Sequence, residues 1–290
     1  MTQTAASSSS PGPGPGANRT LIIEPGRAAK HYWLDLWHYR ELFAILAWRD
    51  ISVQYKQTII GAAWAVIRPA LTMAIFTVVF GRVANLPTEG SVPYPLLVMG
   101  GMLPWFLIST ILTNGSGSLT QNSNLISKVY FPRLIVPVAS SMVALVDFVL
   151  SLGLLFVMMV WFRFLPDWHL LLLPVFVVMA LLAALGPALI MAALNVSYRD
   201  FRFIIPFAVQ FGLYLSPVGF SSAVVPDQWR LLYALNPVVG VIDGFRWSLL
   251  AGETHLDPRS VLISAGVIAL FLWLGIKVFR RTERSFADLV

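Results

Sequence analysis

The chain has 290 residues, of which 57% are hydrophobic and 12% are charged, and its formal net charge is +6. Soluble domains carry about 25% charged residues, so this composition excludes an ordinary soluble protein and indicates an integral membrane protein. Cysteine is absent and the four histidines lack HxxxH or HxH spacing, so we expect neither disulfides nor a metal site.

Residues 1–30 are predicted to form a disordered or extended cytoplasmic segment. Residues 1–18 are rich in Ser, Pro and Gly and contain no apolar run. Such a segment cannot bury enough apolar surface to fold. It also lacks the apolar region of a signal peptide, so we expect no cleavage here.

Residues 31–58 are predicted to form an amphipathic helix at the membrane interface. The stretch 34–57 mixes aromatic residues with acidic and basic ones, which is typical of helices that lie among lipid headgroups. The pattern is imperfect, because Leu42 and Leu46 share a helical arc with several charges. We explain this by partial cover of the helix by other protein.

Residues 59–283 are predicted to form a transmembrane domain with six spans. A helix crosses the hydrocarbon region with about 20 apolar residues. The six apolar segments are 59–81, 94–113, 135–161, 170–194, 203–220 and 261–279. Residues 284–290 would form a short cytoplasmic tail. The predicted fold class is an all-α integral membrane protein.

The Lys and Arg residues determine the predicted orientation. With both termini in the cytoplasm, 15 of the 20 basic residues fall in cytoplasmic segments and the other five fall outside. Cytoplasmic loops carry an excess of Lys and Arg, so we predict that both termini are cytoplasmic. This asymmetry accounts for the positive net charge, so no nucleic-acid partner is needed to explain it.

The connector 221–260 is the longest predicted outside segment. Within it, 229–250 is moderately apolar but is interrupted by Pro237, Gly240 and Gly244. We predict two short re-entrant helices between spans 5 and 6, which a membrane tolerates only where protein or a water-filled cavity covers their ends. An amphipathic hairpin lying on the surface is the alternative.

One acidic residue, Asp147, lies near the middle of a predicted span and is expected to be buried there. A charge at that depth is costly, so it is either a functional group or a hydrogen-bonded contact between helices. A proton-coupled carrier built around Asp147 is therefore an alternative function. A membrane-embedded enzyme that transfers glycans with the outside acids Asp227, Asp243 and Glu253 is another.

The chain lacks a nucleotide-hydrolysing loop of the GxxxxGK[ST] type, because no lysine follows a glycine. A transport chain of this kind needs a surface on which another protein can act. The connector 123–137, SNLISKVYFPRLIVP, combines aromatic side chains with a charged rim, as docking interfaces do. A basic loop resting on lipid headgroups is the alternative. The candidate contact residues are Asn124, Leu125, Lys128, Tyr130, Phe131 and Arg133, and we expect Tyr130 and Phe131 to carry the contact.

Eight strings occur in order along the chain. They are WRDISVQYKQTIIGAAWAVIRP (48–69), FTVVFGRVANLP (76–87), VPYPLLVMGGMLPW (92–105), NLISKVYFPRLIVPVA (124–139), ALNVSYRDFRFIIPF (193–207), LSPVGF (215–220), LNPVVGVIDGFRW (235–247) and FRRTERSFADLV (279–290). The ordered set resembles the permease subunits of polysaccharide-exporting ABC transporters in the type-2 ABC exporter family, and O-antigen exporters most closely. The resemblance runs from about residue 20 to the C-terminus.

The resemblance implies a homodimer in the bacterial inner membrane that works with two copies of a separate ATPase. That partner would bind ATP and Mg²⁺, and this chain would hold no cofactor and no catalytic residue. The connector 123–137 would contain a coupling helix seated on the ATPase, and the interfacial helix would form a gate. Spans 1 and 5 would line a channel that the re-entrant helices close. Teichoic acid, capsule or a hydrophobic drug are alternative cargoes.

Aromatic side chains in the channel-lining spans could stack on sugar faces while the sugar hydroxyls stay hydrated. Lipid contact and an ordinary aromatic belt are the alternative. The candidates are Trp64, Phe76, Phe80, Phe207, Phe211 and Tyr214, with Tyr94, Trp105 and Phe106 as second choices.

Family substrates are carried on a polyprenyl diphosphate lipid, and a diphosphate needs cationic partners. Each candidate cation could equally be a determinant of topology. The candidates are Arg49, Lys56 and Arg68 on the inner side, and Arg230 and Arg246 outside.

Overall fold

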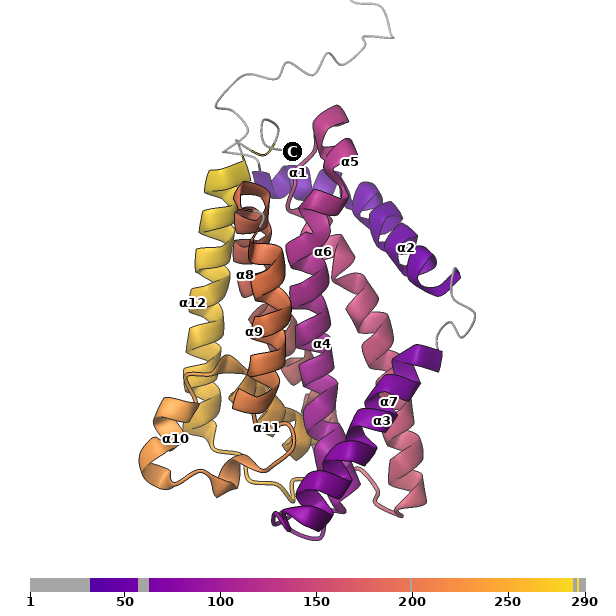
Figure 1. Cartoon of the computed structure of the whole chain (residues 1–290), viewed down its shortest axis with the longest axis vertical. Coiled ribbons are helices and arrows are strands. Elements are labelled where there is room, and N and C mark those ends of the chain that lie inside the picture. The colour runs from indigo at the N-terminus through magenta and orange to yellow at the C-terminus, as the bar shows by residue number, and fades with distance from the viewer. Residues whose placement is uncertain (1–31, 57–62, 199, 284–285, 287–290) are drawn as a thin grey trace, which may run out of the picture.

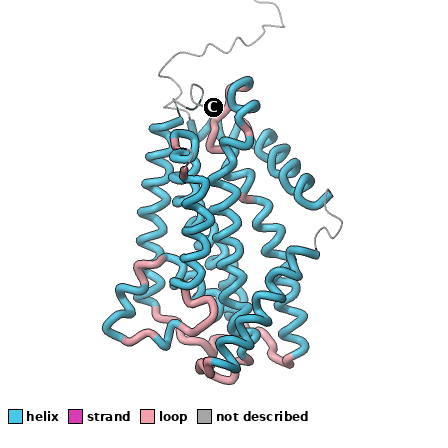
Figure 2. The backbone as a smooth tube through the Cα atoms, viewed as in Figure 1, coloured by secondary structure: helices cyan, strands magenta, loops and turns pink. Residues whose placement is uncertain are grey.

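The computed structural model describes residues 32–56, 63–198, 200–283 and 286. All regular secondary structure in these residues is helical (Figure 1). Figure 2 shows the same helices joined by loops. The prediction of an all-helical membrane protein is confirmed. The predicted segments 1–30 and 284–290 lie outside the described residues, apart from Phe286.

Five helical segments of the described chain are long and apolar enough to cross a membrane. They overlap the predicted spans 1 to 4 and span 6, each of which was predicted from an apolar run long enough to cross the hydrocarbon region. Their elements are α3 (Ala63–Phe76) with the π-helix η2 (Thr77–Val83), α4 (Tyr94–Gln121), α6 (Ile135–Ser140) with α7 (Met142–Trp161), the 3-10 helix η3 (Trp168–Leu172) with α8 (Leu173–Ser197), and α12 (Pro258–Thr282).

The predicted fifth span, 203–220, is the apolar helix α9 (Phe201–Leu215), which has only 15 residues. It ends where Ser216 adopts an extended conformation with ψ of 151°. Pro217 follows, and the residue before a proline is disfavoured in the helical conformation. The count of six spans therefore remains a prediction.

The helix α4 lies at the centre of the bundle and packs against α7, α8, α9 and α11 (Pro237–Leu249). The helix α8, which packs against α4 on one side, also packs against α12, where Gly186 of α8 contacts Gly275 of α12. A methyl group added at Gly275 would lie 2.4 Å from the carbonyl oxygen of Gly186. Small residues let helix backbones approach this closely in membrane proteins, so the pair fixes the spacing of α8 and α12.

The predicted pair of short helices in 229–250 is present as α10 (Asp227–Tyr233) and α11. Most residues of α11 are buried against α4, α8 and α12, whereas α10 has no buried residue. The alternative of a hairpin lying on the surface is therefore wrong for α11. That the two helices are re-entrant remains a prediction.

The predicted interfacial helix is two helices, α1 (Tyr32–His38) and α2 (Arg40–Lys56), with a turn at Tyr39. Leu46 and Ala47 of α2 are buried in a cluster with residues of α6. This contact confirms that other parts of the protein cover α2, which explains its imperfect amphipathic pattern. In Figure 1, α1, α2, α5 (Ser123–Lys128) and the last turns of α12 lie at one end of the bundle, while α10 and α11 lie toward the other.

Candidate functional site

The predicted docking connector projects from one end of the bundle as α5 and the loop after it (Figure 1). Tyr130 is 58% exposed, and Lys128 and Val129 beside it are also exposed. Asn124, on the first turn of α5, is exposed as well, and Leu125 is half-buried. We call the exposed residues Asn124, Lys128, Val129 and Tyr130 the α5 knob.

Phe131 does not belong to the α5 knob, although we expected it to carry the contact. Its ring is only 4% exposed and packs in a cluster with Leu134, Phe279 and Phe286. The chain turns back toward α6 at this point, so adjacent aromatic side chains point in opposite directions. Tyr130 faces outward and Phe131 is part of the core.

Arg133 likewise turns inward rather than toward a partner. Its main-chain N–H donates a hydrogen bond to the Glu283 carboxylate over 2.8 Å, and its guanidinium donates to the main-chain carbonyl oxygen of Glu283. Arg133 is therefore an internal contact to the end of α12 and not a rim residue of the docking surface.

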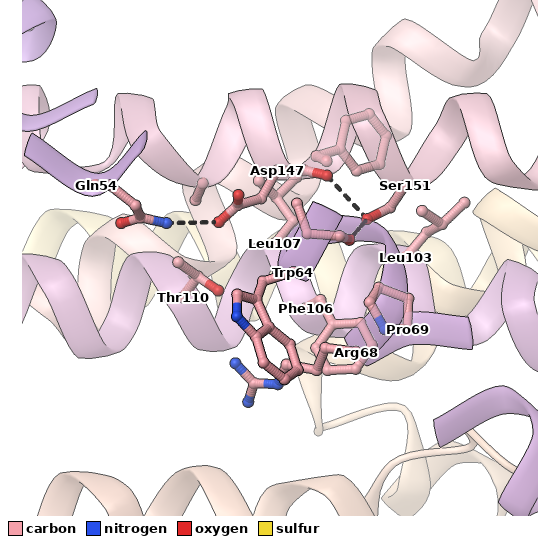
Figure 3. Close-up of a pocket in the computed structure, with 13 residues that line it drawn as sticks. Gln54, Trp64, Arg68, Pro69, Leu103, Phe106, Leu107, Thr110, Asp147 and Ser151 are labelled. Carbon is pink, nitrogen blue, oxygen red and sulfur yellow. Dashed lines mark hydrogen bonds between the residues drawn. The ribbon is translucent and has the colours of Figure 1, made fainter. Parts of the chain in front are cut away.

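A cavity of about 140 Å³ lies between α2, α3, α4 and α7 (Figure 3). Asp147 lines it from α7 and is half-buried rather than buried. The hydroxyl of Tyr55 donates a hydrogen bond to its carboxylate over 2.5 Å, and the side-chain amide of Gln54 donates another over 3.3 Å. Of the two interpretations of Asp147, the structure supports a hydrogen-bonded contact between helices.

Trp64 and Arg68 line the same cavity from α3, one helical turn apart (Figure 3). Both side chains are exposed. The Arg68 guanidinium carbon lies 5.4 Å from the centroid of the Phe106 ring, which is a cation–π distance. The cavity therefore combines a carboxylate, an amide, a cation and an indole ring, which can contact a polar ligand with an apolar face.

A second cleft, of about 400 Å³, adjoins the cavity through Gln54, which lines both. The guanidinium of Arg49 lies in this cleft and donates hydrogen bonds of 2.7 Å to Asp50 and to Asn122. Lys56 is exposed at the end of α2. The three inner cation candidates are therefore all at least partly accessible.

The two outer cation candidates, Arg230 and Arg246, differ in how far their side chains are exposed. Arg230 lies 3.0 Å from Asp227 and lines an open cleft. Arg246 is only 1% exposed. Its guanidinium donates hydrogen bonds to three main-chain carbonyl oxygens, those of Leu97, Val218 and Phe220, over 3.0, 2.8 and 2.8 Å.

The structure therefore does not support the prediction that Arg246 is a diphosphate ligand, and Arg246 is a structural residue. Its donors cap the loop after α9 against α4, and no face of its guanidinium is open to a substrate in this structure.

The aromatic candidates on α9 form an exposed face. Phe207, Phe211 and Tyr214 are all more than half exposed, and the first two rings stack with their centroids 5.9 Å apart. Trp105, a second choice, is buried behind α9, where a methyl group added at Gly212 would touch its ring.

The aromatic candidates on α3 and on η2, which continues it, become less exposed toward the end of η2. Trp64 is exposed, whereas Phe76 and Phe80 are half-buried. Their rings meet edge to face with centroids 5.3 Å apart. A methyl group added at Gly219 would lie 2.9 Å from Phe80, so these rings pack against the loop that follows α9.

The three outside acids Asp227, Asp243 and Glu253 have separate partners and surroundings. Asp227 pairs with Arg230, Asp243 is buried in α11, and Glu253 accepts hydrogen bonds from Ser91. No group of three or more His, Cys, Asp or Glu side chains in the described part of the chain could hold a metal ion.

A family model described as ABC-2 type transporter matches residues 41–250, which include α2 to α11 apart from the first residue of α2. This is more than half of the chain, which therefore belongs to the ABC-2 type transporter family. The described helices are thus those of a multi-pass transporter subunit.

The names of the similar proteins describe a narrower function than the description of the family does. The chain is 28% identical over 260 residues to the O-antigen export system permease protein RfbA of Myxococcus xanthus, which covers 88% of this chain and 98% of that protein. It is 22% identical over 260 residues to the protein of the same name in Klebsiella pneumoniae, covering 88% and 97%. It is 20% identical over 243 residues to the polysialic acid transport protein KpsM of Escherichia coli, covering 82% and 92%. The prediction of a type-2 ABC exporter permease is confirmed.

Proposed function

We propose that this chain is the permease subunit of an ATP-driven transporter that exports a lipid-linked cell-surface polysaccharide of the O-antigen type across the bacterial inner membrane. The relatives named as O-antigen export permeases support the cargo class. The observation that carries the proposed mechanism is the α5 knob, an exposed polar and aromatic projection on a chain without a nucleotide-hydrolysing loop.

The α5 knob is proposed to seat in a partner ATPase, which binds ATP and Mg²⁺. Tyr130 offers a rigid amphipathic anchor. Lys128 near it offers a charged donor, whose hydrogen bonds to a partner would be stronger than those between neutral groups. Two copies of the ATPase would bind two copies of the permease. In this arrangement, the end of the bundle that carries α1, α5 and the end of α12 faces the cytoplasm.

The second copy of the permease is proposed to cover α3 and α9. In the single chain, α9 exposes four aromatic side chains, those of Phe203, Phe207, Phe211 and Tyr214. With 15 residues, α9 is also shorter than the roughly 20 residues that cross the hydrocarbon region. Pairing two such helices across a homodimer interface would give them a protein neighbour. The channel would then run between the copies, with α3 and α9 as its walls.

Transport along this channel is proposed to use weak and repeated contacts. The stacked rings of Phe207 and Phe211 present faces on which sugar rings can stack, while sugar hydroxyls stay in water. Arg49 and Lys56 on α2, together with Arg68, which lies against Phe106 in the middle of α4, would hold the lipid diphosphate by charge-assisted hydrogen bonds. The helix α2 would act as the entrance gate, and α10 with α11 would close the exit.

The similarity to a polysialic acid transport protein favours one second candidate, which is an exporter of an acidic capsule-like glycan. The two cargo classes can be compared by measuring which glycan stimulates the partner's ATP hydrolysis. A proton-coupled carrier has less support, because Asp147 is hydrogen-bonded between helices.

The docking proposal is tested by co-purification of the permease with its ATPase from membranes. The double substitution Lys128→Ala and Tyr130→Ala is expected to abolish co-purification. Trp161→Ala, at an exposed aromatic at the other end of α7, is the matched control and should leave it unchanged. Equal recovery of the ATPase with both variants would contradict the proposal.

A further inference from the structure

Glu283, just after α12, is bonded to two segments that lie far from it in the sequence. The hydroxyl of Tyr32 donates a hydrogen bond to its carboxylate over 3.4 Å, and the main-chain N–H of Arg133 donates another over 2.8 Å. The Arg133 guanidinium also donates to the Glu283 carbonyl oxygen. We call these three residues the Glu283 junction. It joins α1, the end of α12 and the connector after α5.

Aromatic rings and cations pack around the Glu283 junction. The rings of Phe279 and Phe286 are fully buried and meet edge to face with centroids 5.4 Å apart. The Arg133 guanidinium carbon lies 5.8 Å from the centroid of the Phe286 ring. The Arg280 guanidinium carbon lies 4.7 Å from the centroid of the Tyr32 ring. Both cations are therefore held against aromatic faces, which adds attraction to the hydrogen bonds.

Removing the Glu283 carboxyl group from water raises its pKa above its ordinary value. Hydrogen bonds from Arg133 and Tyr32 and the charges of Arg133 and Arg280 oppose this rise. Glu283 is half-buried, and taking a carboxylate out of water is costly unless it is paired and hydrogen-bonded. Because its hydrogen-bond partners come from two other segments, separating either of them from Glu283 would leave a polar group without its partner. The Glu283 junction is therefore expected to resist separation of these segments.

The opposite flank of α5 is fixed as well. Asn122, which precedes α5, accepts a 2.7 Å hydrogen bond from Arg49 on α2 and donates a 2.9 Å hydrogen bond to the Ser118 carbonyl oxygen on α4. The six-residue helix α5 is thus anchored to α2 and α4 before it begins. After it ends, the chain is anchored to α12 and α1. Packed protein interiors have low compressibility and transmit strain, so an element held on both flanks is suited to pass a displacement to the segments that hold it.

We propose that the Glu283 junction is a mechanical tie, through which the connector after α5 moves as one body with α1 and the end of α12. A displacement of α5 would then reach α12 through the Glu283 junction, and would reach α2 both through α1 and through the Arg49–Asn122 hydrogen bond. This inference rests on the proposed function, because it takes the ATPase as the source of the displacement. It gives Arg133 and Glu283 positioning roles, without contact to ATPase or substrate.

The tie is tested by replacing it with a removable covalent link. The chain has no cysteine, so the pair Arg133→Cys and Glu283→Cys can be linked selectively with a short bis-thiosulfonate reagent. In the complete transporter in proteoliposomes, the unlinked pair is expected to bind ATPase normally but to export several-fold less glycan per ATP hydrolysed. Linking should restore this ratio, and reduction of the link should lower it again. Arg281→Ala, at an exposed position on α12, is the matched control with an unchanged ratio.

A merely structural role would lower the yield or assembly of the complex and leave the ratio of export to hydrolysis unchanged. Wild-type coupling in the unlinked pair, or no recovery on linking, would therefore overturn the tie.

A second measurement does not depend on export. The yield of the link is expected to be the same in nucleotide-free and vanadate-trapped transporter, because the two residues stay together throughout the cycle. A yield that depends on the nucleotide state would overturn the tie. Absence of ATP-dependent export by the wild-type complex would instead contradict the proposed function, so the two failures can be told apart.

Discussion

Tyr55 on α2 donates its hydroxyl hydrogen bond to the carboxylate of Asp147 on α7, across 92 positions of sequence. The adjacent Gln54 donates to the other carboxylate oxygen. Two donors from α2 therefore satisfy the acid in the third predicted span, which explains how a carboxylate is accommodated at a costly position. The same contact attaches the proposed gate helix to the bundle.

Tyr55→Phe is expected to destabilise this attachment, because it leaves the carboxylate short of a donor. A typical hydrogen bond contributes about 0.5–1.5 kcal/mol to stability, and the Gln54 amide still donates to the carboxylate in this variant. The loss should appear as a lower melting temperature of the purified protein in detergent. Tyr198→Phe, at an exposed tyrosine, is the control. Equal melting temperatures for the two variants would refute the stabilising role of the Tyr55 hydroxyl.

Asp147→Asn distinguishes a structural carboxylate from a proton carrier. The amide keeps an acceptor oxygen for Tyr55 or Gln54 but cannot carry a proton on a carboxylate. We expect ATP-driven export to continue, with no change in its response to a proton gradient. A flux that follows the gradient in the wild type and loses this response in Asp147→Asn would favour the proton-coupled alternative.

Arg246→Met is expected to prevent normal folding. The substitution keeps an apolar stem but removes the donors for the carbonyl oxygens of Leu97, Val218 and Phe220. Each buried acceptor without a partner costs about 1–3 kcal/mol. The readout is the yield of monodisperse protein after extraction from membranes. Arg259→Met, at an exposed arginine, should be recovered like the wild type, and similar recovery of both variants would contradict the structural role.

Gly275→Ala is expected to separate α8 from α12. The added methyl group would lie 2.4 Å from the Gly186 carbonyl oxygen, and its three nearest atoms all belong to the backbone of Gly186 in α8, which cannot yield cheaply. Gly266→Ala on the same helix meets nothing within 4 Å and should be neutral or stabilising, because alanine is the better helix former. Thermal melts of the two variants in detergent check the difference. A stabilised Gly275→Ala variant would show that the helices are not in close contact.

Asp257 provides the pH-dependent prediction. Its side chain accepts hydrogen bonds from the Ser260 hydroxyl and from the main-chain N–H groups of Arg259 and Ser260, at the start of α12. The hydroxyl is the main cause that lowers the pKa of Asp257. A lowered pKa means that the stabilisation is complete above the ordinary value of about 3.9 and is lost as the pH falls through the lowered one.

Asp257→Ala is therefore expected to cost about 1 kcal/mol at neutral pH, which is typical for the loss of a helix cap. The difference from wild type should shrink as the pH falls below about 4. Melting curves at a series of pH values measure both effects. A difference that stays constant into strongly acidic solution would show that the charge of Asp257 contributes nothing.

The spans could be predicted from the sequence because each rests on one long apolar run. The predicted span 135–161 has the same bounds as the observed segment Ile135–Trp161. Hydropathy alone overestimated 203–220, since it gave no weight to the conformation that Pro217 imposes on Ser216. That proline was the available signal.

The side-chain roles were harder to predict, because they depend on contacts between distant segments. Tyr130 and Phe131 are adjacent and similar, and only the packing of the C-terminal Phe279 and Phe286 shows that the second ring is core. Arg246 was predicted to be an accessible cation, because its hydrogen-bond acceptors could not be foreseen from the sequence. One of them, the Leu97 carbonyl oxygen, lies 149 positions away. The apolar composition of 229–250 around Arg246 was the only sequence signal that this arginine is buried.

The central claim is that this chain moves a lipid-linked glycan only when a partner ATPase drives it through α5. The most direct measurement is export of radiolabelled polyprenyl-diphosphate-linked O-antigen in proteoliposomes that contain the permease alone or with its ATPase. The account predicts export only with the ATPase and hydrolysable ATP, and none when Lys128→Ala and Tyr130→Ala remove the α5 knob. Export by the permease alone, without ATP, would contradict it.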